Sequence, residues 1–475
     1  MQMRIGGAEV ESPSEQWIDV KNPATGEFLD RVPAGSADDI ARAVEAAGAA
    51  GDAWKKKTMR ERGMILFRAA GLVRERHKDL ARLLTMEQGK PLRESVDEVR
   101  GFANILEFYA GISAQQSGEA VRLGAAGDCF VTREPLGVCG AIIPWNMPVL
   151  ILGWKTGPAL LAGNTLVIKP ASTTPLTSLR LAAILDEAGL PPGVLNMVTG
   201  SGEVAGEALV SHPEVKKISF TGNCTTGERV RTLAAARGKE LTLELGGSDP
   251  MIVMDDADIK KAAEGAVRGR FYNAGQTCTA IKRVFVHEKV APEFVRLLKE
   301  RITALNVGNG LGPKTDMGPL NSAAQRDRIS AMVEQTRNEG EGTITGGGSL
   351  RGKAYESGFF YLPALVTGVS AASCLMTEEV FGPVLPVMPV QNLDAAIAAA
   401  NASRYGLGAS VWTTNLHTAR RVFDEVHAGV VWVNRHLTVP PEIPFGGTYG
   451  SGTGRENGHH ALEQYSRTKT LYLGW

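Results

Sequence analysis

Apolar residues in the first ~115 positions recur every three or four residues, which predicts a mostly helical N-terminal region. The clearest example is MILFRAAGLVRERHKDLARLLTMEQG at 64–89. A helix is expected to begin at Ser36, because Ser36 and Asp39 have the spacing of a capping box. Residues 119–140 have the pattern of a β-hairpin around Gly-Ala-Ala-Gly-Asp.

From residue 141 onward, short apolar runs alternate with helical segments. The runs are GAII, TLVIK, VLNMV, KKISF and LTLEL, with helices predicted over 174–189, 202–211 and 225–236. A second alternating region extends from MIVM at 251 to GVVWVN at 429. Repeated β-α-β order predicts parallel sheets with helices on both faces. The last strand, SRTKTLYLGW, has no later segment to pair with, so we expect its partner in another subunit.

The composition narrows the class of protein. A chain of 475 residues predicts two large domains. Basic and acidic residues both number 51, and this balance argues against nucleic-acid or acidic-membrane partners. The most apolar stretch, VCGAIIPWNMPVLILGW, is interrupted by Pro144, Asn146 and Pro148, so it does not predict a membrane span. The segment MQMRIGGAEVESPSEQW lacks the apolar core of a signal peptide.

The five cysteines form no CxxC pair, which argues against a disulfide framework or a zinc ribbon. We therefore expect a cytoplasmic protein with reduced thiols and no bound metal. Cys278 lies in the polar, glycine-containing stretch NAGQTCTA, which is unusual because unpaired cysteines mostly occupy apolar surroundings. It is either an inconsequential loop cysteine or a nucleophile that needs a base.

Three further segments have residue types suited to chemistry. Glu244 ends a predicted strand before two glycines, where a carboxylate is either salt-bridged or functional. Asn146, held between prolines, is either an ordinary turn residue or a donor to an oxyanion. The loop from Gly222 to Gly227 lies between a strand and a helix, but Glu228 stands where a P-loop has Lys. This loop and TGSGEVAG at 199–206 are either plain turns or part of a nucleotide site.

Together these segments form one ordered series: PWN at 144–146, KPAS at 169–172, FTGN at 220–223, ELGG at 244–247, NAGQTC at 273–278 and EEVFGP at 378–383. PFGGTYGSGTGRENG closes it at 444–458. The series resembles the NAD(P)+-dependent, non-acylating members of the aldehyde dehydrogenase superfamily over essentially the whole chain. The resemblance implies an α/β fold with a Rossmann-like dinucleotide-binding domain, an α/β catalytic domain and a small β oligomerisation element.

The resemblance also implies roles for individual residues. Cys278 would attack the aldehyde, Glu244 would activate the thiol or the deacylating water, and Asn146 with the Cys278 N–H would form the oxyanion hole. Glu456 matches a residue sometimes proposed as a proton relay. The implied residues for NAD or NADP are Ile142, Ile143, Trp145, Lys169, Ser172, Gly202, Phe220, Gly222, Asn223, Gly227, Leu245, Glu379 and Phe381.

Two departures from the family pattern concern the cofactor. Asn223 replaces the usual Ser, and Ser172 stands where many NAD-preferring members carry Glu. We therefore expect use of both NAD and NADP.

The expected substrate is an uncharged aliphatic or aromatic aldehyde. Members that use succinate semialdehyde often carry arginines at positions that hold Trp154 and Tyr272 here, and Met147, Ile151 and Phe445 complete the predicted apolar mouth. The alternatives are a semialdehyde substrate, a CoA-acylating member and a catalytically silent binding protein. Glu244 argues against the acylating class, whose members typically lack this base.

The domain limits are expected at 1–118 and 138–246 for dinucleotide binding and at 247–450 for catalysis. Residues 119–137 and 460–475 are expected to form the oligomerisation element of a homodimer or homotetramer.

Overall fold

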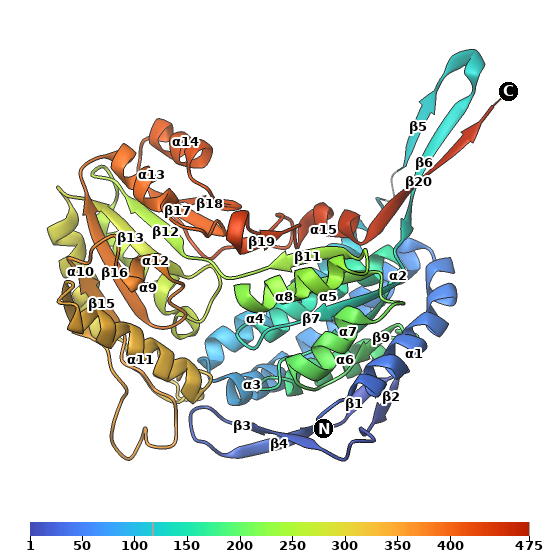
Figure 1. The fold of residues 1–475 in the computed structure, drawn as a ribbon, viewed down its shortest axis with the longest axis horizontal. Coiled ribbons are helices and arrows are strands. Elements are labelled where there is room, and N and C mark those ends of the chain that lie inside the picture. Colours follow the sequence, from blue (N-terminus) through green and yellow to red (C-terminus); the bar gives the residue numbers. More distant parts are fainter. Residues whose placement is uncertain (116–117, 475) are drawn as a thin grey trace.

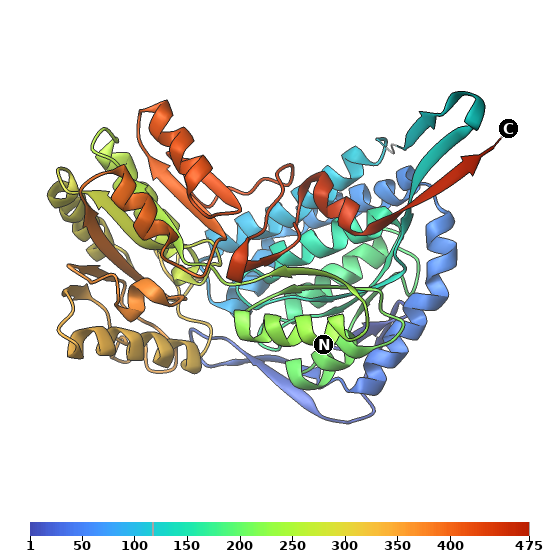
Figure 2. The same ribbon diagram turned by 45° about the horizontal axis from the view of Figure 1, so that its top comes forward.

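The computed structural model describes residues 1–115 and 118–474, so Gln116, Ser117 and Trp475, at the edges of predicted domain segments, lie outside the described residues. Figures 1 and 2 show two lobes and a projecting arm that ends at the C-terminus. Each lobe is built on one large, mostly parallel sheet with helices packed around it, and the predicted α/β class is confirmed.

The first lobe contains an eight-stranded sheet. Its order is β19 (Gly452–Thr453), β11 (Glu240–Glu244), β10 (Lys217–Thr221), β7 (Val138–Ile142), β8 (Thr165–Lys169), β9 (Leu195–Met197), β1 (Met3–Ile5) and β2 (Ala8–Val10). The five strands from β11 to β9 are parallel, and they are almost wholly buried because both faces of the sheet are covered.

The helices of the first lobe are α1 (Ala37–Lys56), α2 (Met59–Glu75), α3 (His77–Gln88), α4 (Leu92–Ile112), α5 (Pro148–Ala162), α6 (Leu176–Glu187), α7 (Glu207–Ser211), α8 (Cys224–Ala235) and α15 (Gly458–Gln464). The capping box at Ser36 is present, with both reciprocal hydrogen bonds to Asp39. The predicted helix over 202–211 begins as a π-helical turn, Gly202–Gly206, and continues as α7.

The helical prediction for the first ~115 residues is correct from Ala37 onward and wrong before it. Four short strands precede α1, namely β1, β2, β3 (Trp17–Lys21) and β4 (Phe28–Pro33). They are three to six residues long, so their apolar period is too brief to recognise. The strand β1 also depends on a long-range partner, since Arg4 pairs with Met197 of β9.

The second lobe is built on a seven-stranded sheet. Its order is β14 (Thr343–Gly346), β15 (Ala364–Thr367), β16 (Val384–Val390), β13 (Ile281–His287), β12 (Asp249–Val253), β17 (Gly408–Trp412) and β18 (Val430–Val433). Its helices are α9 (Ile259–Phe271), α10 (Ala291–Thr303), α11 (Ala323–Asn338), α12 (Cys374–Thr377), α13 (Leu393–Asn401) and α14 (Leu416–Glu425). The chain passes from the first sheet to the second through residues 245–248.

The arm is a three-stranded antiparallel sheet of β5 (Glu119–Arg122), β6 (Asp128–Pro135) and β20 (Ser466–Leu473). The hairpin therefore ends at Pro135, before β7. The expectation that the tail strand lacks a partner in its own chain is wrong, because β20 pairs along its whole length with β6. That partner precedes it by more than 300 residues, and only the folded chain brings the two together.

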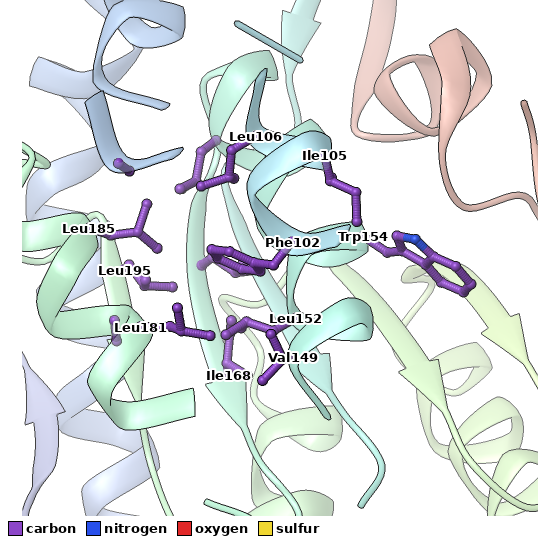
Figure 3. Close-up of a cluster of buried hydrophobic side chains, with 14 of the residues drawn as sticks. Phe102, Ile105, Leu106, Val149, Leu152, Trp154, Ile168, Leu181, Leu185 and Leu195 are labelled. Carbon is purple, nitrogen blue, oxygen red and sulfur yellow. The ribbon is translucent and has the colours of Figure 1, made fainter. Parts of the chain in front are cut away.

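The core of the first lobe fixes the helix that faces the second lobe. Figure 3 shows Phe102 of α4 close to Leu152 of α5, with Leu181 and Leu185 of α6 to one side of them. These side chains are almost fully buried. In the same view Trp154 of α5 points away from this cluster, toward the opposite side of the helix. The face of α5 that carries Trp154 is thus available to line a cavity.

Candidate active site

The first sheet reverses its strand order at β7. The chain continues through β8 and β9 on one side of β7 and through β10 and β11 on the other. Such a reversal opens a crevice beyond the carboxyl ends of the strands. A cavity of about 410 Å³ lies at this point, lined by residues that end these strands, among them Ile142, Lys169, Thr221 and Glu244.

Most of the residues predicted for cofactor binding line this cavity. They are Ile142, Ile143, Trp145, Lys169, Ser172, Gly202, Phe220, Gly222, Asn223, Glu379 and Phe381. Gly227 and Leu245 do not line it. They pack against each other instead, and a Cβ added to Gly227 would come within 2.4 Å of Leu245 Cδ2. Gln325 and Arg328 of α11 also line the cavity and carry no sequence motif that could have identified them.

One end of the cavity is suited to an anionic ligand. Asn223 caps α8, its side chain accepting a hydrogen bond from Thr226 N at 2.8 Å, and a helix N-terminus favours negative charge. The Lys169 ammonium donates to the carbonyls of Pro170 at 2.7 Å and Gly200 at 3.3 Å. Ser172 Oγ donates to the same Gly200 carbonyl at 3.1 Å. Burial lowers the pKa of Lys169 to about 8.

The other end is formed by the EEVFGP and ELGG segments. Glu379 accepts a hydrogen bond from Gly247 N at 3.1 Å. A Cβ at Gly246 would come within 2.1 Å of the Glu379 carboxylate, so only glycine permits this approach. The rings of Phe381 and Trp145 meet edge to face at 5.6 Å. This end therefore combines a fixed carboxylate with two aromatic rings.

Cys278 lies at the junction of this cavity and a second cavity of about 460 Å³. All five residues predicted for the substrate line the second cavity: Met147, Ile151, Trp154, Tyr272 and Phe445. Trp154 packs on Phe445 with a ring separation of 4.8 Å. The lining also contains the exposed charged residues Asp97, Arg268 and Arg435, which the sequence did not indicate.

The loop before the thiol has a constrained backbone. Asn273 and Ala274 both have left-handed dihedrals, with φ of 51° and 53°. For residues other than glycine this conformation costs about 1–2 kcal/mol each, and surrounding contacts must stabilise it. Asn273 N donates to the Glu94 carboxylate at 2.8 Å, and the Gln276 side chain donates to Asn273 O at 3.0 Å. Burial raises the pKa of Glu94 to about 8.

A buried ion pair fixes the Asn146 segment. The Lys90 ammonium contacts Glu98 at 2.5 Å, and both side chains are fully buried. Lys90 also donates to Asn146 O at 2.6 Å, while Glu98 accepts from Val149 N at 2.8 Å at the start of α5. The Asn146 amide donates to Gln276 O at 3.0 Å, so it reaches the loop that carries Cys278.

Glu244 is the last residue of β11 and is 1% exposed. Among the described residues, neither of its carboxylate oxygens has a hydrogen-bond partner. Burial raises the pKa of Glu244 to about 8. Burial also raises the pKa of the Cys278 thiol well above its usual value, and the nearby Glu244 charge adds to this shift. Burial thus disfavours the charged form of both groups.

Glu456 lies behind the site and does not line either cavity. It is 1% exposed, pairs with Lys155 at 2.5 Å and accepts a hydrogen bond from Ser219 Oγ at 3.0 Å. Lys155 in turn donates to Thr221 Oγ1 at 2.9 Å. A structural ion pair accounts for these contacts of Glu456.

Comparison with known proteins identifies the family. The model of the aldehyde dehydrogenase family matches residues 10–471, and the chain belongs to this family. The family fold predicted from the sequence is confirmed, as is the class of NAD(P)-dependent oxidoreductase.

Solved structures agree over the full length. A Burkholderia cenocepacia protein named as an aldehyde dehydrogenase is 37% identical, with a TM-score of 0.98 over 100% of this chain and 97% of its own. An E. coli NADP-dependent enzyme is 37% identical, with a TM-score of 0.97 over 100% and 98%. Betaine aldehyde dehydrogenase of Staphylococcus aureus, in complex with NAD+, is 34% identical, with a TM-score of 0.97 over 100% and 95%.

Within residues 1–115 and 118–474, no three His, Cys, Asp or Glu side chains are grouped so as to hold a metal ion. Over the same residues, no helix combines the length and apolar character needed to cross a membrane.

Proposed function

We propose that the protein oxidises an aldehyde to the carboxylic acid through a covalent intermediate on Cys278. The observation that carries this proposal is the position of the thiol where two cavities meet, with Glu244 lining one of them. One cavity is suited to the cofactor and the other to the aldehyde. Their meeting point brings a carbonyl group to the thiol beside the cofactor.

The residues of the first cavity fit NAD or NADP. Lys169, Ser172 and the N-terminus of α8 would hold the adenosine ribose and the phosphates, and Glu379 with Phe381 would hold the nicotinamide ribose. Gly246 and Gly222 leave room where a Cβ would meet Glu379 or Phe220. When bound, the nicotinamide supplies the hydride acceptor for the oxidation.

The side chains have separate tasks in this reaction. The Cys278 sulfur, as thiolate, adds to the aldehyde carbonyl and forms a tetrahedral thiohemiacetal. The Asn146 amide and the Cys278 N–H stabilise its oxyanion. After oxidation a thioester remains on Cys278. Glu244 takes a proton from water, which attacks the thioester and releases the carboxylic acid and the thiol.

The walls beside the thiol support an uncharged aliphatic or aromatic substrate. Met147, Ile151, Trp154, Tyr272 and Phe445 present apolar or aromatic surface to the second cavity. A semialdehyde is the second candidate, because Arg268 and Arg435 also line this cavity. Arg435 Nε donates to Thr438 Oγ1 at 2.7 Å, and both arginine residues are exposed.

The arm supports assembly into a homodimer or homotetramer. It exposes large apolar side chains on β5, β6 and β20, among them Val121, Phe130, Leu471 and Tyr472. The strands β20 and β5 form the two edges of its sheet, and an open edge can pair with another chain.

The proposed site of action is the cytoplasm.

Replacing Cys278 by Ala should abolish aldehyde oxidation, because no other group can form the covalent intermediate. Cofactor binding, measured by fluorescence titration, should be nearly unchanged. Cys224→Ala is the matched control, since this thiol at the start of α8 has no role in the proposed chemistry. More than a trace of activity in the Cys278 variant, or loss of activity in the control alone, would contradict the proposed nucleophile.

Replacing Glu244 by Gln should leave a burst of reduced cofactor and then stall turnover, since a general base contributes about 10²–10⁴-fold to a rate. In the wild type, steady-state activity should rise with pH through about 8, as Glu244 loses its proton and becomes a base. The variant should lose this rise. Stopped-flow and steady-state measurements across pH test both points, and unchanged steady-state turnover in the variant would remove Glu244 from the mechanism.

The wild-type enzyme should use NAD+ and NADP+ with a preference below about two orders of magnitude in kcat/KM. Ser172 lacks the negative charge that would repel a 2′-phosphate, and Lys169 lines the same cavity. Ser172→Glu should sharply reduce kcat/KM for NADP+ and leave NAD+ nearly unaffected. Thr226→Glu introduces the same negative charge at another position in the cavity and serves as the comparison for the Ser172 variant. A wild type that ignores NADP+, or equal losses with both cofactors in the Ser172 variant, would refute this role.

A panel of aldehydes distinguishes the two substrate classes. If Arg268 and Arg435 bind a distal carboxylate, Arg268→Gln and Arg435→Gln should each raise KM for succinate semialdehyde about tenfold. Neither change should affect an uncharged aromatic aldehyde. Arg420→Gln, an exposed site on α14, is the control. If KM for succinate semialdehyde in the Arg268 and Arg435 variants stays at the wild-type value, as in the control, the result would favour the uncharged class of substrate.

A further inference from the structure

The strand that follows the nucleophile loop carries a fully buried lysine. Lys282 is the second residue of β13, and its side chain is 0% exposed. Its ammonium donates to the main-chain carbonyls of Cys278 at 2.5 Å and Thr277 at 3.1 Å. It also pairs with the Glu379 carboxylate at 3.2 Å. A buried ammonium is costly unless it is paired in this way, so these contacts define where it lies.

The contacts of Lys282 join two parts of the active site that are 101 residues apart in the sequence, Cys278 and Glu379. Glu379 is itself fixed by Gly247 N, and the Phe381 ring lies 5.7 Å from the Lys282 ammonium. Gly247 is closely packed here as well. A Cβ at that position would come within 3.1 Å of Cys278 O.

The charged groups around the thiol act in opposite directions. The charges of Glu244 and Asp249 raise the pKa of Cys278, while the positive charge of Lys282 opposes them. Asp249 is itself buried, which raises its pKa to about 7. His436, whose ring nitrogen lies 2.7 Å from Thr279 O, adds no positive charge at neutral pH because burial lowers its pKa to about 4.

We propose that Lys282 is a positioning residue of the active site, which ties the peptide of Cys278 to the carboxylate of Glu379 and keeps a positive charge near the reactive sulfur. This inference rests on the proposed function in taking Cys278 as the nucleophile. A purely structural lysine would stabilise the fold without favouring the thiolate. The two roles therefore differ in the pH dependence of thiol reactivity.

The test is the rate at which iodoacetamide alkylates Cys278 in the full-length protein, followed by peptide mass mapping across pH. Lys282→Met and Lys282→Gln should move the midpoint of the pH profile upward by about one unit, which makes alkylation near neutral pH about tenfold slower. Lys282→Arg should restore most of the wild-type rate. Lys289→Met, at an exposed lysine beyond the end of β13, is the control and should leave the midpoint unchanged.

The single variants Lys282→Met and Lys282→Gln leave Glu379 without its ionic partner, which is unfavourable for folding. A second comparison allows for this effect. The double variant Lys282→Met with Glu379→Gln removes both charges of the pair. Measured against Glu379→Gln alone, it should show the same upward shift of the alkylation midpoint. Circular dichroism verifies that each protein is folded.

An unchanged midpoint in folded Lys282→Met, or in the double variant against its reference, would overturn the proposal. The alkylation rate requires no aldehyde turnover. Failure of this inference is thus distinguishable from failure of the proposed function, which the activity of Cys278→Ala decides. In steady-state assays, the loss in kcat/KM for the aldehyde in Lys282→Met should shrink as pH rises, because the thiolate then forms without the lysine.

Discussion

The strained loop from Asn273 to Cys278 determines the geometry of the whole site. Its two consecutive left-handed residues are unfavourable by themselves, so the loop depends on contacts from elsewhere in the chain. Glu94 of α4 holds its start, and the Lys90–Glu98 pair acts through Asn146 O. Glu94 and Glu98 lie on α4, and Lys90 lies in the loop before it. These contacts from the first lobe therefore fix the position of the Cys278 loop relative to the first sheet.

Buried charge has two different uses in this site. The pair of Lys90 and Glu98 is fully partnered and serves only to fix main-chain groups. Glu244 is equally buried, yet neither of its oxygens has a partner among the described residues. Leaving a buried carboxylate without hydrogen bonds is unfavourable for stability, and such groups are concentrated where proton transfer is needed. The contrast between the two carboxylates is consistent with a structural role for Glu98 and with the chemical role proposed for Glu244.

The sequence predicted those parts of the site that lie in continuous motifs. Asn146, Glu244, Cys278 and Glu379 each end a strand or occupy a loop whose glycines or prolines mark it. All four line the first cavity, and Cys278 also lines the second. Lys282 follows Cys278 by only four residues, but in the strand IKRVFVH it is one of two adjacent basic residues and no motif distinguishes it. Its role depends on Glu379, which only the fold brings within 3.2 Å. Arg328 was missed for the same reason, since α11 reaches the cavity from the other lobe.

The two cavities differ in the kind of element that lines them. The cofactor cavity lies at a reversal of strand order, where strand ends and glycines have fixed positions. The walls of the substrate cavity come from side chains on α4, α5, α9 and the loop after β18, and its apolar members alternate with core residues on the same helices. On α5, Trp154 faces the cavity while Leu152 faces the core, and their hydropathy alone does not tell them apart. Charged residues such as Arg435 lie on loops that follow no periodic pattern. The sequence motifs therefore predict the scaffold, but they do not identify all the individual side chains that line the second cavity.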